Sequence, residues 1–258
     1  INDGGTISAE KIKGSISFKD VNFSYVSGEQ VLYEINLDVK PGEKIAIVGS
    51  TGAGKSTIIN LLSRFYENKT GMITIDNISI KDFSIQFLRK HVGVILQDVF
   101  LFADTIYNNI VLFNTDVKKE DVYDAAKQIG VHEFISSLPG GYQYNVKERG
   151  VMLSSGQRQL IAFLRVYLSN PSILVLDEAT SSIDSYSEEL IQKAIKKITE
   201  EKTAIVIAHR LSTIKNSDRI VVMDKGRVVE VGKHDELVTI KGGYYSQLYQ
   251  IQFLQEAV

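Results

Sequence analysis

The chain has 258 residues with 29 basic and 31 acidic side chains, a net charge of −2 and no cysteine. The absence of cysteine excludes disulfides, zinc–thiolate sites and iron–sulfur clusters, and the near-zero charge gives no global reason to expect nucleic acid or an anionic membrane as a partner. No apolar run reaches the roughly 18 residues that a membrane-spanning helix needs, so we expect a chain that is soluble by itself, whatever lies outside it.

The first part of the chain is a polar segment followed by alternating apolar and polar residues. Residues 1–14 show no periodicity, so we expect a linker or flexible terminus before a domain over 15–258. The alternation over 16–25 and 31–39 predicts antiparallel strands in an N-terminal β-subdomain. The continuous apolar run 44–48 predicts a strand buried on both faces.

Strands and helices alternate in the rest of the chain. The predicted elements are a helix over 57–66, strands over 72–75 and 92–96, a mainly helical stretch over 105–168, strands over 173–176 and 204–208, an amphipathic helix around 190–198, and paired strands over 220–223 and 228–231. This alternation indicates a mostly parallel sheet covered on both sides. We therefore predict an α/β fold with an α-helical subdomain, over about 98–170, inserted in the core.

A glycine-rich motif lies between the strand predicted at 44–48 and the following helix. It matches the pattern G-x-x-x-x-G-K-[ST] and consists of Gly49, Ser50, Thr51, Gly52, Ala53, Gly54, Lys55, Ser56 and Thr57. Glycines let backbone N–H groups point into one hollow at the positive end of the helix, which favours a triphosphate. Lys55 can reach the β- and γ-phosphates, and Ser56 can bind the Mg²⁺ that accompanies the nucleotide. The alternative is a strand-to-helix turn of structural use only.

Two carboxylates follow the apolar strand predicted at 173–176. Asp177 and Glu178 come at the carboxyl end of that strand, where ligands bind in open α/β sheets. If this strand is a neighbour of the strand before the phosphate loop, Asp177 can orient Mg²⁺ and Glu178 can polarise the attacking water. A solvated strand end is the alternative for an isolated acidic pair.

A third motif, shortly before the acidic pair, joins the other two into a family pattern. It resembles the LSGGQ signature of ATP-binding-cassette (ABC) ATPases and consists of Leu153, Ser154, Ser155, Gly156 and Gln157. With the phosphate loop and the acids in the family's order, the resemblance covers the chain from about Ile16 to Leu248. It implies a P-loop NTPase core that binds ATP and Mg²⁺ and acts as a Mg²⁺-dependent ATPase.

The resemblance also assigns roles outside the three motifs. Tyr25 matches the aromatic residue that stacks on adenine, and Gln97 matches the glutamine that senses Mg²⁺ and the attacking water. His209 matches the histidine that contacts the γ-phosphate, and Asp184 lies in a loop similar to the one that crosses to the opposing subunit. Each residue type alone is more often a packing or surface residue, so the assignment depends on their joint order. The implied catalytic residues are Lys55, Gln97, Glu178 and His209, and the implied metal-binding residues are Ser56, Gln97 and Asp177.

The signature motif has a physical interpretation of its own. Ser154 and Gly156 lie at the predicted start of a helix, so their N–H groups can form a second anion site. In ABC ATPases two such domains pack head to tail, with the signature of one over the γ-phosphate held by the other, which implies a homo- or heterodimer. Ser155 departs from the usual glycine and adds a Cβ near a close backbone approach, and we expect it to be tolerated.

Three short segments resemble the exporter branch of the family. They are Arg64-Phe65-Tyr66, Gln97-Asp98-Val99-Phe100-Leu101-Phe102 and Glu148-Arg149-Gly150. The apolar trio Phe100, Leu101 and Phe102 would be costly to expose, so we hypothesise that it lines a groove for a short helix of a membrane domain. Burial inside the helical subdomain is the alternative.

These features together imply the ATP-binding and ATP-hydrolysing motor domain of an ABC exporter. We expect it at the cytoplasmic face of the membrane, attached through transmembrane domains that are not in this chain. The alternatives are a soluble ABC-type ATPase acting on nucleic acid or ribosomes and a nucleotide-gated regulator without turnover. The chain carries no long coiled-coil insertion or tandem cassette of the soluble class, so no nucleic-acid partner is expected. The transported substrate depends on membrane segments that this sequence does not include.

Overall fold

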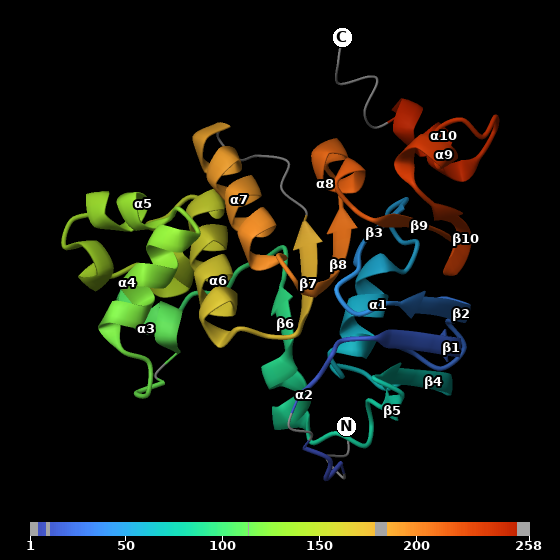
Figure 1. Ribbon diagram of the computed structural model, residues 1–258, viewed down its shortest axis with the longest axis horizontal. Helices are drawn as coiled ribbons and strands as arrows, with labels where there is room; N and C mark the ends of the chain where they lie inside the picture. Colours follow the sequence, from blue (N-terminus) through green and yellow to red (C-terminus); the bar gives the residue numbers. More distant parts are fainter. Residues whose placement is uncertain (1–4, 9–10, 113, 179–184, 252–258) are drawn as a thin grey trace. The chain divides into compact units, whose positions relative to one another are not determined.

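The computed structural model describes residues 5–8, 11–112, 114–178 and 185–251, with two compact units (Figure 1). We call them the sheet unit and the helical unit and describe each by itself. The sheet unit comprises Ile1–Val94, Ser172–Ala179 and Glu201–Val258. The helical unit comprises Ile95–Pro171 and Thr180–Glu200.

An antiparallel sheet forms the N-terminal part of the sheet unit and confirms the predicted β-subdomain. Its four strands follow the order β2-β1-β4-β5 (Figure 1) and are β1 (Ile16–Phe23), β2 (Leu32–Val39), β4 (Thr70–Ile75) and β5 (Ile78–Ser79). Ile16 lies opposite Val39 of β2 and Ile75 of β4. A β-bulge interrupts the alternation at Asp20, which has a φ of 48°. The bulge returns the apolar residues that follow to the buried face.

The second sheet is mostly parallel, as predicted, and has the strand order β10-β9-β3-β8-β7-β6. Its strands are β3 (Lys44–Gly49), β6 (Val92–Ile95), β7 (Ile173–Glu178), β8 (Thr203–Ala208), β9 (Arg219–Asp224) and β10 (Arg227–Gly232). Strand β3 pairs in parallel with β8 and β9, whereas β9 and β10 form an antiparallel hairpin. Every residue of β8 is buried, which explains why these central strands are continuous apolar runs rather than alternating ones.

Five helices lie among the described residues of the sheet unit, and α1 contributes several side chains to its core. They are α1 (Lys55–Leu62), α2 (Ile85–His91), α8 (Leu211–Lys215), α9 (His234–Leu237) and α10 (Tyr244–Tyr249). Ile58, Ile59 and Leu61 of α1 join one hydrophobic cluster with side chains from both sheets. This packing fixes the helix that begins at the phosphate loop.

Helix α1 differs from the sequence prediction of 57–66 at both ends. It begins at Lys55, directly after Gly54, and ends at Leu62. Arg64, just beyond it, has a φ of 47° and is buried, and its guanidinium donates to the carbonyl oxygens of Ile80 and Phe83. The chain therefore turns out of the helix to satisfy a buried cation, which periodicity alone does not indicate.

The segment expected to be a linker contains residues that pack in the sheet unit. Ile7 forms an isolated bridge with Phe83, and Ile12 is buried in the core cluster. The Asp76 carboxylate accepts hydrogen bonds from the backbone N–H groups of Lys13, Gly14 and Ser15. Ordered packing thus begins before Ser15 within the part of this segment that the structure describes.

The helical unit is built around α6, and the predicted amphipathic helix near its end is α7 (Figure 1). Its elements are α3 (Ile106–Val111), α4 (Lys119–Gln128), α5 (His132–Ser137), the 3-10 turns η1 (Gly141–Gln143) and η2 (Glu148–Gly150), α6 (Ser155–Ser169) and α7 (Ser185–Ile198). Helices α3, α4 and α7 all pack against α6. Ile191, Ala194 and Ile198 are the buried residues of the α7 stripe that the sequence predicted.

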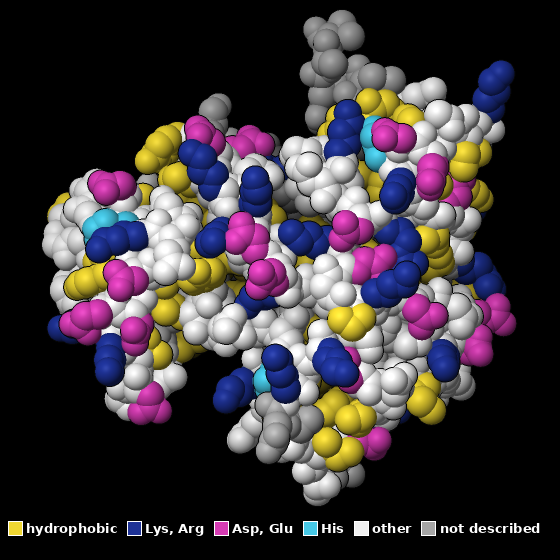
Figure 2. All heavy atoms as spheres, in the orientation of Figure 1, with side chains coloured by type: hydrophobic (Ala, Val, Ile, Leu, Met, Phe, Trp, Pro, Cys, Tyr) yellow, Lys and Arg dark blue, Asp and Glu magenta, His cyan; other side chains and the backbone are white. Residues whose placement is uncertain are grey.

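The surface carries charges of both signs. On the face that Figure 2 shows, lysine and arginine side chains lie interspersed with aspartate and glutamate. Among the described residues, no helix combines the length and the apolar character that crossing a membrane requires.

Candidate functional site

The glycine-rich turn between β3 and α1 can be formed only with glycine at two of its positions. Gly49 has a φ of 152°, and a Cβ there would lie 2.2 Å from the carbonyl oxygen of Met223. Gly54 has a φ of 96°, and a Cβ would lie 2.6 Å from a methyl carbon of Leu32. No described residue outside the loop's neighbouring positions would lie within 4 Å of a Cβ at Gly52. The turn is therefore packed against the sheet on one side and open on the other, as an anion cradle requires.

The Lys55 amine is held over this turn by the loop's own carbonyl groups. Its Nζ donates to the oxygens of Gly49 at 2.8 Å and Ser50 at 2.9 Å. Burial lowers the pKa of Lys55, and the negative charge of Asp177 acts in the opposite direction. A partly desolvated ammonium group above a helix N-terminus provides a favourable environment for a phosphate group.

Ser56 and Asp177 meet at the edge of the same loop. The Ser56 hydroxyl donates to Asp177 Oδ2 at 3.2 Å, so two of the three residues expected to bind Mg²⁺ lie together. Burial raises the pKa of Asp177, and the Ser56 hydrogen bond, His209 and Lys55 oppose that rise. Mg²⁺ is commonly held by one or two carboxylates plus phosphate and water oxygens, so this small donor set fits the ion.

The route by which Asp177 reaches the loop differs from the one that the sequence suggested. Strands β3 and β7 are not neighbours, because β8 lies between them. The three strands are parallel, so their carboxyl ends lie at one edge of the sheet, and Asp177 reaches Ser56 across the end of β8.

His209 directly follows β8. This strand lies between β3, which leads into the phosphate loop, and β7, which carries Asp177. Burial and the positive charge of Lys55 lower the pKa of His209 below the usual 6.5, whereas Asp177 raises it. At neutral pH the imidazole is therefore uncharged and can donate or accept a hydrogen bond. The structure thus brings together Lys55, Ser56, Asp177 and His209, which the sequence proposed separately.

Two predicted residues are described only in part or not at all. Glu178 is the last residue of β7, and its backbone pairs in register with Ala208. Its side chain, like the whole of Asp184, lies outside the described residues.

Tyr25 lies just after β1, and its ring is about half exposed. Its hydroxyl is 3.2 Å from Thr57 Oγ1 and accepts a hydrogen bond from Asn60 Nδ2 at 3.0 Å. Tyr25, the base-stacking residue expected from the resemblance, is therefore hydrogen-bonded to α1, the helix that follows the phosphate loop. The sequence analysis did not identify Asn60, because one asparagine on a helix surface carries no signal.

Gln97 and the signature motif belong to the helical unit. Gln97 is exposed just after β6. Ser154 is the N-cap of α6: its Oγ accepts from the N–H of Gln157, and the Gln157 side chain accepts from the N–H of Ser154. Ser155 is the first residue of the helix and is exposed, so its Cβ is accommodated within this unit without a left-handed backbone.

The apolar trio after Gln97 divides between surface and core, so neither the groove nor the burial hypothesis holds for all three residues. Leu101 is fully buried, whereas Phe100 and Phe102 are 57% and 45% exposed. Their rings form an edge-to-face pair with centroids 5.2 Å apart. Asn109 fixes the backbone here, accepting from the N–H of Phe102 and donating to its carbonyl oxygen.

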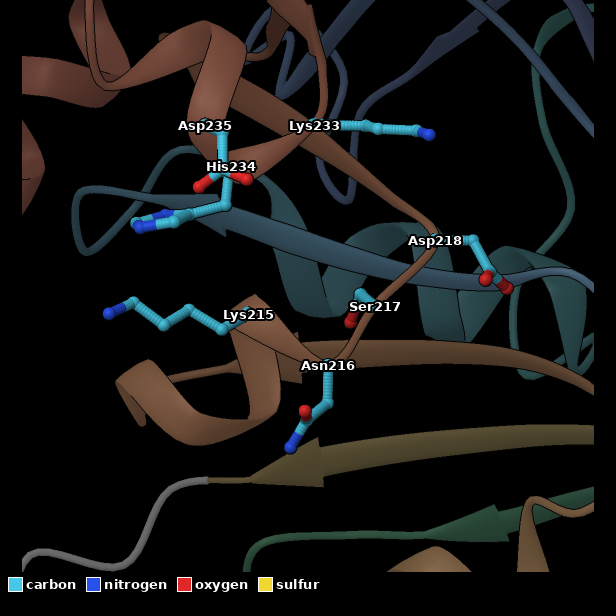
Figure 3. Close-up of a pocket in the computed structure, with 7 residues that line it drawn as sticks. All are labelled: Lys215, Asn216, Ser217, Asp218, Lys233, His234 and Asp235. Carbon is cyan, nitrogen blue, oxygen red and sulfur yellow. The ribbon is translucent and has the colours of Figure 1, made fainter.

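A separate cavity of about 540 Å³ lies in the sheet unit between the α8–β9 connection and the start of α9. Its lining residues are Lys215, Asn216, Ser217, Asp218, Lys233, His234 and Asp235. Figure 3 shows Lys215 and His234 on one side and Lys233 extending away from them. The charged groups do not converge on one point, and no residue of the phosphate loop lines this cavity.

Comparisons with known proteins show which family this chain resembles. The profile of the ABC transporter family matches residues 32–181. The uncharacterized ABC transporter ATP-binding protein YknV of Bacillus subtilis is 48% identical over 95% of this chain and 40% of its own length. An ATP-dependent lipid A-core flippase of Legionella pneumophila is 46% identical over 97% of this chain and 42% of its own length.

A solved structure shows the same fold. The structure of a bacterial Atm1-family ABC exporter with ATP bound superposes with a TM-score of 0.88 at 38% identity, over 98% of this chain and 44% of that chain. The chain therefore spans less than half the length of these relatives. The phosphate loop, the Ser56–Asp177 pair and these matches lead to one conclusion: the chain is an ATP-binding domain that belongs to the ABC transporter family.

Proposed function

We propose that this chain is the Mg²⁺-dependent, ATP-hydrolysing motor domain of an ABC exporter. The observation that carries the proposal is the Ser56–Asp177 hydrogen bond beside the loop-bound amine of Lys55. This arrangement provides a phosphate cradle, a cation for the terminal phosphates and two oxygen ligands within reach of one another.

The reacting groups divide the work between binding and chemistry. Lys55 and the loop N–H groups would hold the phosphates, while Ser56 and Asp177 would hold Mg²⁺, which would neutralise part of the phosphate charge. Neutral His209 hydrogen-bonds the terminal phosphate, and Glu178 at the end of β7 polarises the attacking water. The resemblance to the family assigns Gln97 the role of sensing Mg²⁺ and the attacking water.

The proposed partner is a second ABC ATPase domain, either a copy of this chain or a relative. The N-terminus of α6, capped by Ser154, would cover the γ-phosphate bound by the partner, with Ser155, Gly156 and Gln157 beside it and Asp184 crossing the interface. ATP would then join the two domains, and hydrolysis would release them.

Export itself requires transmembrane domains outside this chain. The flippase and the exporter among the similar proteins are more than twice as long as the part that matches this chain. Their additional length supports the proposal that membrane domains lie outside the matched part. The motor would then lie at the cytoplasmic face of the membrane. The names of these relatives favour transport over the nucleic-acid alternative.

The test compares ATP hydrolysis and ATP binding in two variants. Wild-type chain should hydrolyse ATP with Mg²⁺ and lose activity in a chelator. Glu178→Gln should bind ATP, turn over at least about a hundredfold more slowly and accumulate as an ATP-bound dimer by size-exclusion chromatography. Lys55→Ala should bind ATP roughly tenfold to a hundredfold more weakly, because a charge-assisted contact is lost.

An exposed lysine provides the matched control. Lys81→Ala removes the same kind of side chain away from the loop and should leave affinity and turnover unchanged. Near wild-type turnover in Glu178→Gln would remove that residue from the catalytic role, and full affinity in Lys55→Ala would contradict the cradle.

A further inference from the structure

The hydroxyl of Tyr25 is held by two residues of α1 that share one face of the helix. Thr57 and Asn60 are three positions apart, so their side chains project in the same direction. The Tyr25 oxygen lies 3.2 Å from Thr57 Oγ1 and accepts from Asn60 Nδ2 at 3.0 Å. Thr57 is also the last residue of the phosphate-loop motif, so these contacts connect Tyr25 directly to that motif.

The ring of Tyr25 is held by two further aromatic residues. Its centroid lies 4.8 Å from that of Phe23 and 4.8 Å from that of Tyr66, with interplanar angles of 89° and 88°. Phe23 is buried and also contacts Tyr66, which anchors the group to the core. Edge-to-face pairs of this kind restrict ring orientation beyond simple contact.

Without these contacts, Tyr25 would be a surface residue on a turn. It follows β1 in a bend, and about half of its ring is open to solvent. An unrestrained side chain there would lose rotamer freedom whenever a base stacked on it, and that loss would weaken binding. The hydrogen bonds and ring contacts restrict this freedom in advance.

We infer that Asn60 and Tyr66 are positioning residues that hold the Tyr25 ring in the orientation that receives the base of ATP. The inference rests on the proposed function, in which Tyr25 is the base-stacking residue. Asn60 holds the hydroxyl through a hydrogen bond from α1, and Tyr66 holds the ring through an edge-to-face contact. Neither residue belongs to the phosphate-loop motif, so we expect their effect to be confined to ligands that carry a base.

The experiment measures calorimetric affinity for two probes, a non-hydrolysable ATP analogue and inorganic triphosphate, both with Mg²⁺. Asn60→Ala should bind the analogue about three- to tenfold more weakly, the range expected for one neutral hydrogen bond, and should bind triphosphate like wild type. Tyr25→Phe should show the same selective loss. The double variant should be no weaker than Tyr25→Phe alone, because Tyr25→Phe already lacks the bond that Asn60→Ala removes.

Tyr66 is tested by a conservative pair of substitutions. Tyr66→Phe keeps the ring and should retain wild-type affinity, whereas Tyr66→Ala should weaken binding of the analogue alone. Asn36→Ala is the matched control, because Asn36 is an exposed asparagine of the same unit whose side chain bonds Asp20 and Glu34 instead. It should leave both affinities unchanged.

The outcomes separate this inference from the proposed function. Equal weakening of both probes in Asn60→Ala, or additive losses in the double variant, would overturn the positioning role, since the substitutions would then be disturbing the phosphate loop or acting independently. Unchanged affinity for the analogue in Asn60→Ala and Tyr66→Ala would also overturn it, while leaving the ATPase intact. Failure of wild-type chain to bind either probe would instead contradict the proposed function.

Discussion

Single side chains in this protein owe their properties to what surrounds them rather than to residue type. Lys55, Asp177 and His209 come from three different segments. Lys55 and Asp177 each change the pKa of the other two groups, and His209 lowers the pKa of Asp177. Burial opposes the charged form of every member of the group, while the attraction between Lys55 and Asp177 favours it. A bound triphosphate with Mg²⁺ would change both effects, which is why the group is suited to respond to ligand.

A second histidine offers a pH test away from this site. His234 Nδ1 lies 2.7 Å from the Tyr245 hydroxyl, and burial raises the pKa of Tyr245 to about 12, so that hydroxyl keeps its proton at physiological pH. Burial and then Lys215 lower the pKa of His234, and Asp235 opposes them. The folded state therefore favours neutral His234, whose unfolded pKa is about 6.5.

Stability should consequently fall as the pH drops below about 6.5, because the unfolded chain then binds a proton that the folded chain resists. The contribution is present above that pH and is lost as the pH falls through the lower, folded pKa. In urea unfolding between pH 7.5 and 5, the free energy of unfolding should decrease less for His234→Gln than for wild type. Lys215→Ala should show an intermediate slope, and identical slopes in all three proteins would contradict the assignment.

At the level of whole elements, helix ends carry much of the function. Helix α1 starts at the phosphate loop, and α6 starts at the signature motif with a reciprocal capping box between Ser154 and Gln157. The same N–H groups that a cap satisfies in part are those proposed to meet a phosphate. The cap and a bound phosphate would therefore use the same N–H groups. Substitutions of Ser154 can distinguish the effect on stability from the effect on phosphate binding.

Ser154→Ala should destabilise the chain by about 1 kcal/mol in urea unfolding, because the N-cap acceptor is lost. Ser154→Asp should retain stability, since aspartate is an equally good cap, but its charge should repel the partner's γ-phosphate and abolish the ATP-induced dimer of Glu178→Gln. Ser169→Ala, at the other end of α6, is the control and should affect neither property. A stable dimer with Asp at position 154 would argue against the signature helix as a phosphate site.

Element boundaries also show where periodicity is a reliable guide. The buried runs of β3, β7 and β8 and the stripe of α7 follow from apolar spacing and were predicted with small end errors. The end of α1 is not predicted by this spacing. The helix ends before Arg64, which has a left-handed backbone and is buried where it can donate to the carbonyl oxygens of Ile80 and Phe83. Periodicity reports which face is apolar, and it does not report what a neighbouring segment requires.

For the whole molecule, we propose that the exposed ring pair Phe100–Phe102 is the surface that contacts a membrane domain. Both rings are held outward while Leu101 anchors the segment in the core of the helical unit. Exposed aromatic rings on a fixed backbone are a suitable surface for a short helix from a membrane domain.

Phe102→Asp should therefore uncouple the assembled transporter. Basal ATPase of this chain should be retained, whereas stimulation by the membrane domains and transport in reconstituted vesicles should both be lost. Met72→Asp is the control, because Met72 is similarly exposed but lies on β4 of the sheet unit. Unchanged transport with Asp at position 102 would rule out this surface as the coupling site.

The sequence alone was sufficient to identify the family to which this chain belongs. The order of the phosphate loop, the signature motif and the acidic pair identified the family, because each motif consists of consecutive residues whose spacing is local. The apolar runs likewise identified the mostly parallel sheet and its antiparallel companion.

Only the tertiary structure decided how those residues meet. It showed that β8 separates β3 from β7 and that Asp177 nevertheless reaches Ser56, that Leu101 is buried between two exposed rings, and that Asn60 holds Tyr25. These contacts join residues far apart in the chain, and their strength depends on packing and burial that no local pattern of residue types contains.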